Sequence, residues 1–235
     1  MRQKENLVLL SGLLCDETVW KDVAKDLDDI ANIYMISFKG CDSIQMMAQK
    51  VLDNSPEHFC LVGHSMGARV ALEMMKHSAS RVKKLALFNT GVHPVSDLEI
   101  QGRQKLINIA REEGIPSLMK QWLPPMMSKS GLENEKLMKE LEKMVQSYSV
   151  EEYLKQINAL INRPEAEDIL SSISIPTLLL SGTEDKWSPI SQHEEMQKKI
   201  KNCKLIKVQD AGHMAPAEEP KIVAKAILNL LNSNY

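Results

Sequence analysis

The feature that most constrains this chain is Gly63-His64-Ser65-Met66-Gly67, a G-x-S-x-G pattern between two runs of opposite character. The apolar run at 58–62 predicts a buried strand, and the run at 69–76 is rich in helix formers. The pattern alone also occurs by chance in loops, but strand–turn–helix context favours a functional turn. Such a turn strains Ser65, while the glycines let strand and helix approach closely. The helix N-terminus then directs free N–H groups towards any anion beside Ser65.

Short apolar runs alternate with helical patterns over residues 1–94. We expect strands at 6–10, 33–36, 58–62 and 82–88, and helices at 17–27, 43–52 and 69–76. Strands linked by helices predict a mostly parallel sheet with helices on both faces, hence an α/β fold. Right-handed crossovers bring the carboxyl ends of the strands to one edge, where ligand crevices form. Ser65 lies at that edge.

The alternation stops between residues 95 and 171, where no strand is expected. Helices are expected at 98–111, 115–122, 132–147 and 150–161, and Ser149 with Glu152 forms a capping box for the last of them. The sheet resumes at 176–181 and ends at 204–208, a half-exposed run typical of an edge strand. We therefore predict an α/β core formed by 1–94 and 172–235, with 95–171 as a helical cap or lid.

The composition excludes several partners. The 29 basic and 31 acidic residues give a net charge of −2, which attracts neither nucleic acid nor an anionic membrane. Four cysteines without a C-x-x-C spacing indicate thiols in a reducing compartment. The apolar run at 7–15 is broken by Ser11-Gly12, which favours a strand entering a turn over a signal peptide, and no run reaches transmembrane length. We expect a soluble cytoplasmic protein, a monomer or homodimer.

A serine hydroxyl reacts near neutral pH only with an imidazole to accept its proton and a carboxylate to orient that imidazole. His213 follows the last expected strand, at the same edge as Ser65, and is the expected base. Asp185 directly follows another strand and is the expected acid; Glu184 is its rival, and a turn-capping role is the alternative for Asp185. The other histidines lie in a strand, in the turn, on helices or at the start of the insertion: His58, His64, His77, His193 and His93.

The order Ser65, Asp185, His213 resembles that of the α/β-hydrolase fold family. The resemblance covers nearly the whole chain, through the G-H-S-M-G turn, a G-x-x-D loop at 182–185 and an A-G-H-M loop at 211–214. The opening stretch at 10–20 is similar to that of small carboxylesterase-like members, although many relatives have His where this chain has Ser11. The sequence opens directly at the strand expected at 6–10, without the hairpin that usually precedes it in the family, so we expect a sheet smaller than the family's usual eight strands. The resemblance also implies that the backbone N–H groups of Leu13 and Met66 form an oxyanion hole.

The resemblance implies a carboxylic-ester hydrolase that forms an acyl-enzyme on Ser65 from a small-molecule ester, with no metal or organic cofactor. Thioesterase, carbon–carbon hydrolase and lyase activities on the same three residues remain open, as does a slow-turnover ligand receptor. Arg69 also occurs in relatives that make a menaquinone precursor by elimination. A helix-surface role for Arg69 is favoured.

Five residues are candidates for substrate binding. They are His93, Trp122, Met126, Met127 and Trp187. The run at 122–127 is apolar but is broken by Pro124-Pro125, so it cannot form one regular helix. Its flexible methionines suit an adaptable pocket wall. The alternative is that these side chains only pack the cap onto the core.

Overall fold

The structure is a computed structural model that describes residues 4–233. Six parallel strands form one sheet in the order β2-β1-β3-β4-β5-β6. They are β1 (Glu5–Leu10), β2 (Ala31–Met35), β3 (Phe59–His64), β4 (Val82–Phe88), β5 (Thr177–Gly182) and β6 (Cys203–Val208). The expected parallel sheet is confirmed. Strand β3 begins one residue later than expected, so His58 lies just before it.

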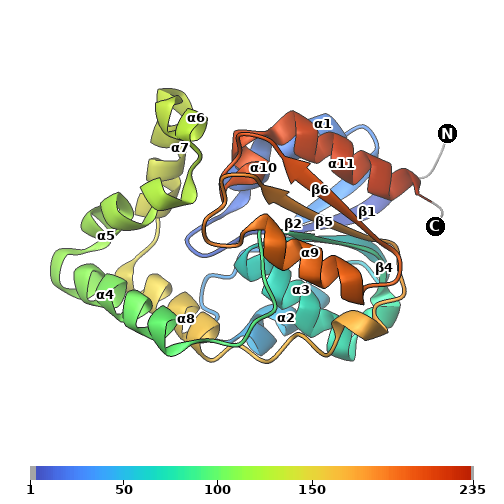
Figure 1. Cartoon of the computed structure of the whole chain (residues 1–235), viewed down its shortest axis with the longest axis horizontal. Helices are drawn as coiled ribbons and strands as arrows, with labels where there is room; N and C mark the ends of the chain where they lie inside the picture. Colours follow the sequence, from blue (N-terminus) through green and yellow to red (C-terminus); the bar gives the residue numbers. More distant parts are fainter. Residues whose placement is uncertain (1–3, 234–235) are drawn as a thin grey trace.

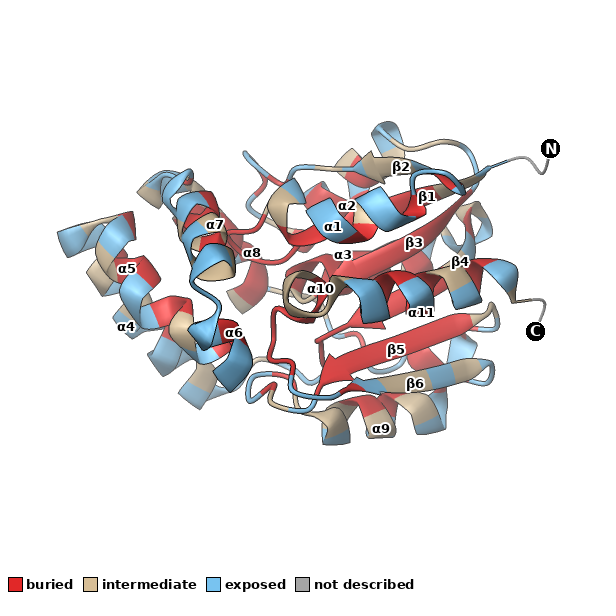
Figure 2. Ribbon diagram, turned by 90° about the horizontal axis from the view of Figure 1, so that it is seen from above, coloured by how far each residue is buried: buried red, intermediate tan, exposed pale blue. Residues whose placement is uncertain are grey.

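Helices cover both faces of the sheet, as Figure 1 shows. On one face α1 (Lys21–Leu27), which follows the short 3-10 helix Glu17–Trp20, packs against α11 (Pro220–Asn232). On the other lie α2 (Ile44–Asp53), α3 (Met66–His77) and α9 (Ile190–Lys199). Because both faces are covered, the central strands are buried along almost their whole length (Figure 2). Edge strand β6 is partly exposed, as expected.

The segment between β4 and β5 is helical. It contains α4 (Asp97–Glu113), α5 (Ile115–Trp122), α6 (Lys129–Glu133), α7 (Glu135–Gln146) and α8 (Val150–Ile161). In Figure 2 the arrowhead of β5 points towards these helices, so they stand beyond the carboxyl ends of the strands. The single helix expected at 132–147 is wrong, because Asn134 ends α6 and its side chain caps α7 by accepting from the Leu137 N–H.

The turn around Ser65 is tightly packed. Ser65 has a φ of 54°, in the left-handed region that non-glycine residues disfavour. A Cβ on Gly63 would lie 2.5 Å from the Gly67 carbonyl oxygen, and a Cβ on Gly67 would collide with the Leu10 carbonyl. The two glycines therefore let α3 start directly against β1 and β3, which holds Ser65 in its strained position.

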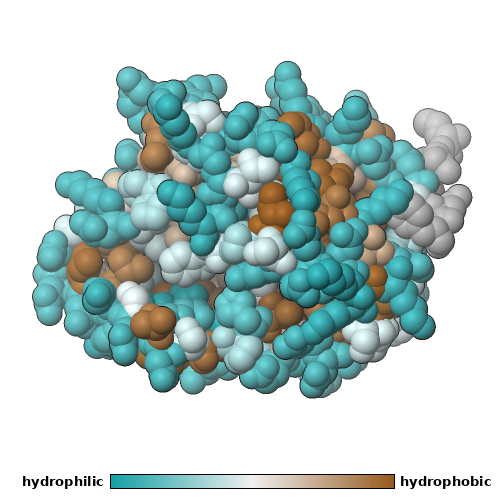
Figure 3. Space-filling view, viewed as in Figure 1, coloured by the Kyte–Doolittle hydropathy of each residue, from teal (hydrophilic) through white to brown (hydrophobic). Residues whose placement is uncertain are grey.

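Within residues 4–233, none of the helices combines the length and the apolar character that crossing a bilayer requires. The face shown in Figure 3 is mainly hydrophilic, and its hydrophobic side chains lie in separate groups.

Gly67→Ala should destabilise the fold, because the added methyl group has no room beside the Leu10 backbone. We expect a loss of about 2 kcal/mol or more in the free energy of unfolding, measured by urea denaturation. Gly102→Ala is the matched control: nothing lies within 4 Å of its added Cβ in helix α4, and it should gain roughly 0.5–1 kcal/mol. Equal effects of the two substitutions would contradict this account of the turn.

Candidate active site

Three side chains form a continuous hydrogen-bonded line at the carboxyl edge of the sheet. Ser65 Oγ lies 2.8 Å from His213 Nε2, and His213 Nδ1 lies 2.9 Å from Asp185 Oδ2. Ser65 follows β3, Asp185 follows β5 and His213 follows β6, so three separate connections meet at one point. The structure thus brings together the three residues that the sequence singled out.

Asp185 is buried and receives several hydrogen bonds. Its Oδ1 accepts from the backbone N–H groups of Trp187 (2.9 Å) and Ser188 (2.8 Å), while Oδ2 also accepts from Asn89 Nδ2 at 2.9 Å. Burial acts to raise the pKa of Asp185, but His213 and these N–H donors outweigh it and hold the pKa at about 2. The ionised carboxylate therefore accepts from Nδ1–H of His213, which leaves Nε2 as the acceptor for the Ser65 hydroxyl.

The turn-capping role considered for Asp185 is also present, because one carboxylate oxygen caps the turn and the other faces His213. Its rival Glu184 has a structural role instead. Glu184 Oε2 accepts from the Lys129 N–H at 2.8 Å, at the start of α6. Glu184 therefore holds the helical segment and lies outside the line of three side chains.

The backbone of His213 is held on both sides. Its N–H donates to the Met126 carbonyl at 2.7 Å, and its carbonyl accepts from His64 Nε2 at 2.7 Å. Burial, together with the neighbouring His213, lowers the pKa of His64 to about 3. His64 is therefore a neutral donor, and its structural role includes fixing the loop that carries His213.

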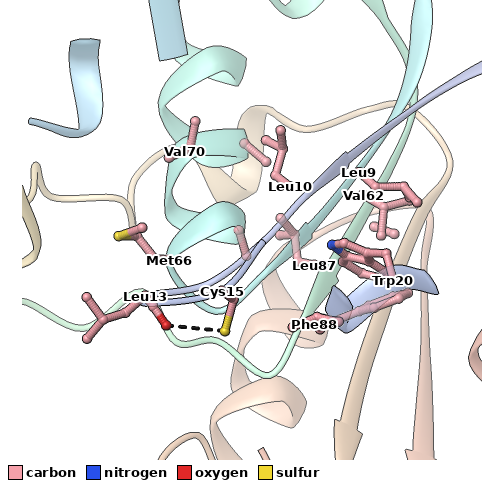
Figure 4. Packing of buried hydrophobic residues seen from close by; sticks show 14 of the residues in the cluster. Leu9, Leu10, Leu13, Cys15, Trp20, Val62, Met66, Val70, Leu87 and Phe88 are labelled. Atoms are coloured by element: carbon pink, nitrogen blue, oxygen red, sulfur yellow. Dashed lines mark hydrogen bonds between the residues drawn. The ribbon is translucent and has the colours of Figure 1, made fainter. Parts of the chain in front are cut away.

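The expected oxyanion donors lie beside Ser65. A Cβ on Gly12 would lie 3.1 Å from Ser65 Cβ, so the turn that leads to Leu13 is in close contact with the serine. Met66 is the first residue of α3, where backbone N–H groups have no partner within the helix. Leu13 and Met66 both line the cavity at Ser65, and both are labelled in Figure 4.

A cavity of about 410 Å³ opens at Ser65 and His213. Four of the five candidate binding residues line it: His93, Trp122, Met126 and Trp187. Met127 does not; it is buried against α6, where its Cε lies close to Gly131. Trp187 is 45% exposed and stands at the rim, with the Arg103 guanidinium 5.7 Å from its ring centre.

The cavity also holds charged residues that the sequence did not single out. Arg103 and Arg163 line it together with Arg69 and Glu99. Glu99 carboxylate oxygens lie 2.6 and 2.7 Å from Arg163 nitrogens and 2.8 Å from Arg103 Nη2. The surface position favoured for Arg69 is wrong, because only 8% of this residue is exposed and its Nη2 donates to the His93 carbonyl.

A family model described as alpha/beta hydrolase fold matches residues 41–220. The chain belongs to the α/β-hydrolase family. It is 25% identical to 3-oxoadipate enol-lactonase 1 of Acinetobacter baylyi, over 76% of this chain and 67% of that protein. It is 24% identical to the pimeloyl-(acyl-carrier protein) methyl ester esterase of Legionella pneumophila (strain Paris), over 88% of this chain and 87% of the relative. A thermophilic esterase from Thermogutta terrifontis superposes with a TM-score of 0.88 and 25% identity, covering 97% of this chain and 90% of that one. The named relatives are hydrolases of ester bonds.

The position of Met126 in the cavity wall predicts a change in substrate range. Met126→Ala should shift the preferred acyl-chain length, with each methylene of fit worth roughly 1 kcal/mol in kcat/KM. Met127→Ala is the matched control, since it removes the same side chain from packing outside the cavity and should lower the melting temperature without reordering substrates. A panel of esters of increasing chain length, measured on both variants, checks this. An unchanged ranking in Met126→Ala would exclude the wall role.

Proposed function

We propose that this chain is a carboxylic-ester hydrolase that works through an acyl-enzyme on Ser65. The observation that carries the proposal is the hydrogen-bonded line from Ser65 through His213 to the ionised Asp185, which opens onto a cavity. This arrangement suits the activation of a serine hydroxyl by a neutral imidazole. The esterase and lactonase names of the relatives support the same reaction class.

In the proposed reaction Ser65 Oγ attacks the ester carbonyl while His213 Nε2 takes the hydroxyl proton. Asp185 stabilises the resulting imidazolium, and the N–H groups of Leu13 and Met66 stabilise the oxyanion. Each such donor contributes about 3 kcal/mol where comparable donors have been removed. His213 passes the proton to the leaving alcohol, and a water molecule activated by the same imidazole hydrolyses the acyl group from Ser65.

The cavity charge indicates an ester that also carries a carboxylate. Three arginines but only one glutamate, Glu99, line the cavity. Two guanidinium nitrogens are buried without a hydrogen-bond partner, Nη1 of Arg69 and Nε of Arg163. Burial and the nearby Arg163 also lower the pKa of Arg69. A bound carboxylate would offset the surplus positive charge of this lining, since buried charges are costly when unpaired.

A lyase is the second candidate, because Arg69 faces the cavity as it would in relatives that catalyse an elimination. Thioester and carbon–carbon bond hydrolysis use the same three residues. Turnover in ¹⁸O-labelled water separates hydrolysis from elimination, because any of these hydrolyses places one labelled oxygen in the released acid and elimination does not. Comparing oxygen esters, thioesters and diketones as substrates then separates the three hydrolase classes. A receptor would instead show near-zero turnover together with stabilisation by its ligand.

Ser65→Ala should abolish ester hydrolysis, because it removes the hydroxyl that is hydrogen-bonded to His213 Nε2. A fluorophosphonate should label Ser65 in the unmodified protein and leave Ser65→Ala unlabelled. Ser188→Ala is the control, since Ser188 lines the same cavity but donates no bond to His213 among those described. Intact-mass and peptide mass spectrometry locate the adduct. Labelling of any serine other than Ser65 would refute the assignment.

Arg69→Met should separate charged from neutral substrates. We expect kcat/KM for monomethyl glutarate to fall about 10- to 100-fold, as charge-assisted hydrogen bonds contribute roughly 1.5–3 kcal/mol. Methyl pentanoate, a neutral ester of similar length, should change about twofold or less. Arg111→Met is the matched control, because Arg111 is exposed on α4. Rates come from pH-stat titration of the released acid. An equal loss on both esters would mean that Arg69 only holds the structure.

A further inference from the structure

Two side chains of the helical segment hold the turn that carries Leu13. Gln156 Oε1, on α8, accepts from the Leu14 N–H at 2.9 Å, and the Tyr148 hydroxyl, just before α8, donates to the Cys15 carbonyl at 2.8 Å. Both side chains are almost wholly buried, Gln156 with 1% of its surface exposed. Residues more than 130 positions away in the chain therefore meet the turn next to Ser65.

This turn is strained at Leu14. Residues 12–15 form a β-turn, closed by a bond from the Cys15 N–H to the Gly12 carbonyl at 3.3 Å. Leu14 occupies the third position with a φ of 54°, where glycine or asparagine is normally required. A leucine stays there only when its surroundings hold it.

The peptide between Leu13 and Leu14 is held at both of its polar ends. Its carbonyl accepts from the Cys15 thiol at 3.2 Å, shown by the dashed line in Figure 4, and its N–H donates to Gln156. Without the Gln156 oxygen, this buried N–H would lose its acceptor. The strain at Leu14 would then favour rotation of the peptide, which changes the backbone angles next to the Leu13 N–H.

We propose that Gln156 is a positioning residue that keeps the Leu13 N–H aimed at the oxyanion. The inference rests on the proposed function, in which Leu13 is one of the two oxyanion donors. The inference makes the helical segment part of the catalytic apparatus. The oxyanion hole is fully formed only while α8 is docked on the turn at residues 12–15. Gln156 touches neither the substrate nor the reacting atoms and acts only through Leu14.

The test measures the rate at which a fluorophosphonate labels Ser65, because negative charge develops on the phosphoryl oxygen as the serine attacks and fluoride leaves. This rate needs no knowledge of the natural substrate. Gln156→Met keeps the size of the side chain but removes the acceptor, and labelling should slow at least tenfold; complete removal of a donor typically slows catalysis by about 10²–10³. For a cleaved ester, kcat should fall while KM stays within about twofold.

Gln156→Glu provides the rescue, because a carboxyl group of the same length keeps an acceptor in either protonation state. Its labelling rate should lie within about threefold of the unmodified protein. Tyr153→Phe and Ile157→Val are the controls on the same helix: Tyr153 has a buried hydroxyl without a partner, and Ile157 is buried by packing alone. Both should label at the normal rate, and their melting temperatures show how much slowing general destabilisation of α8 causes.

The inference is overturned if Gln156→Met labels as fast as the unmodified protein, or no slower than Ile157→Val at equal loss of melting temperature. Should Gln156→Met fail to fold, Gln156→Leu removes the same acceptor from the Leu14 N–H with a shorter side chain, and a normal labelling rate there overturns the inference equally. The proposed function fails differently: the unmodified protein would then label at Ser65 yet cleave no ester, and the labelling rates would still report on Gln156.

Discussion

The close contact of α3 with β1 and β3 is the constraint on which the site depends. It leaves no room for a Cβ at Gly63 or Gly67, and it holds Ser65 at a φ of 54°. That backbone conformation lifts the serine side chain out of the sheet while the first N–H groups of α3 point the same way. The strain is tolerated because the carboxyl-terminal halves of the surrounding strands are buried, so relaxing the turn would disrupt the core.

The parallel direction of the strands brings the other two residues of the site to Ser65. Since β5 and β6 run in the same direction as β3, the loops that follow them reach the same edge. Asp185 and His213 thus meet Ser65 although more than a hundred residues separate the serine from either of them in the chain. Asn89, also at a positive φ, joins the two loops by donating to Asp185 and to the Gly212 carbonyl.

The core and the residues Ser65, Asp185 and His213 were predictable from the sequence because each gives a local signal. These signals are apolar runs, a G-x-S-x-G turn, and polar residues directly after strands. Arg103 and Arg163 were not, because an arginine in a helical segment has the same local signal whether it faces water or a cavity. Gln156 gave no signal either, since its partner Leu14 is distant in the chain and the bond exists only in the folded state. Met126 and Met127 share one apolar run, and only the path of the chain after Pro125 decides that one faces the cavity.

The helical segment is hydrogen-bonded to the core at the loop that carries His213 and at the turn that carries Leu13. Met126 accepts from the His213 N–H, and Glu218 accepts from the N–H groups of both Ser128 and Gly212, so the loop of the histidine and the start of α6 share one half-buried carboxylate. Gln156 makes the corresponding link to the turn of Leu13. A segment that merely covered the cavity would need none of these bonds. Because the same segment also carries Arg103 and Arg163, a substrate anion bound by the arginines would stabilise the docked helices that hold the histidine and the oxyanion turn. Under the proposed function, these contacts would couple recognition of the substrate to the readiness of the serine.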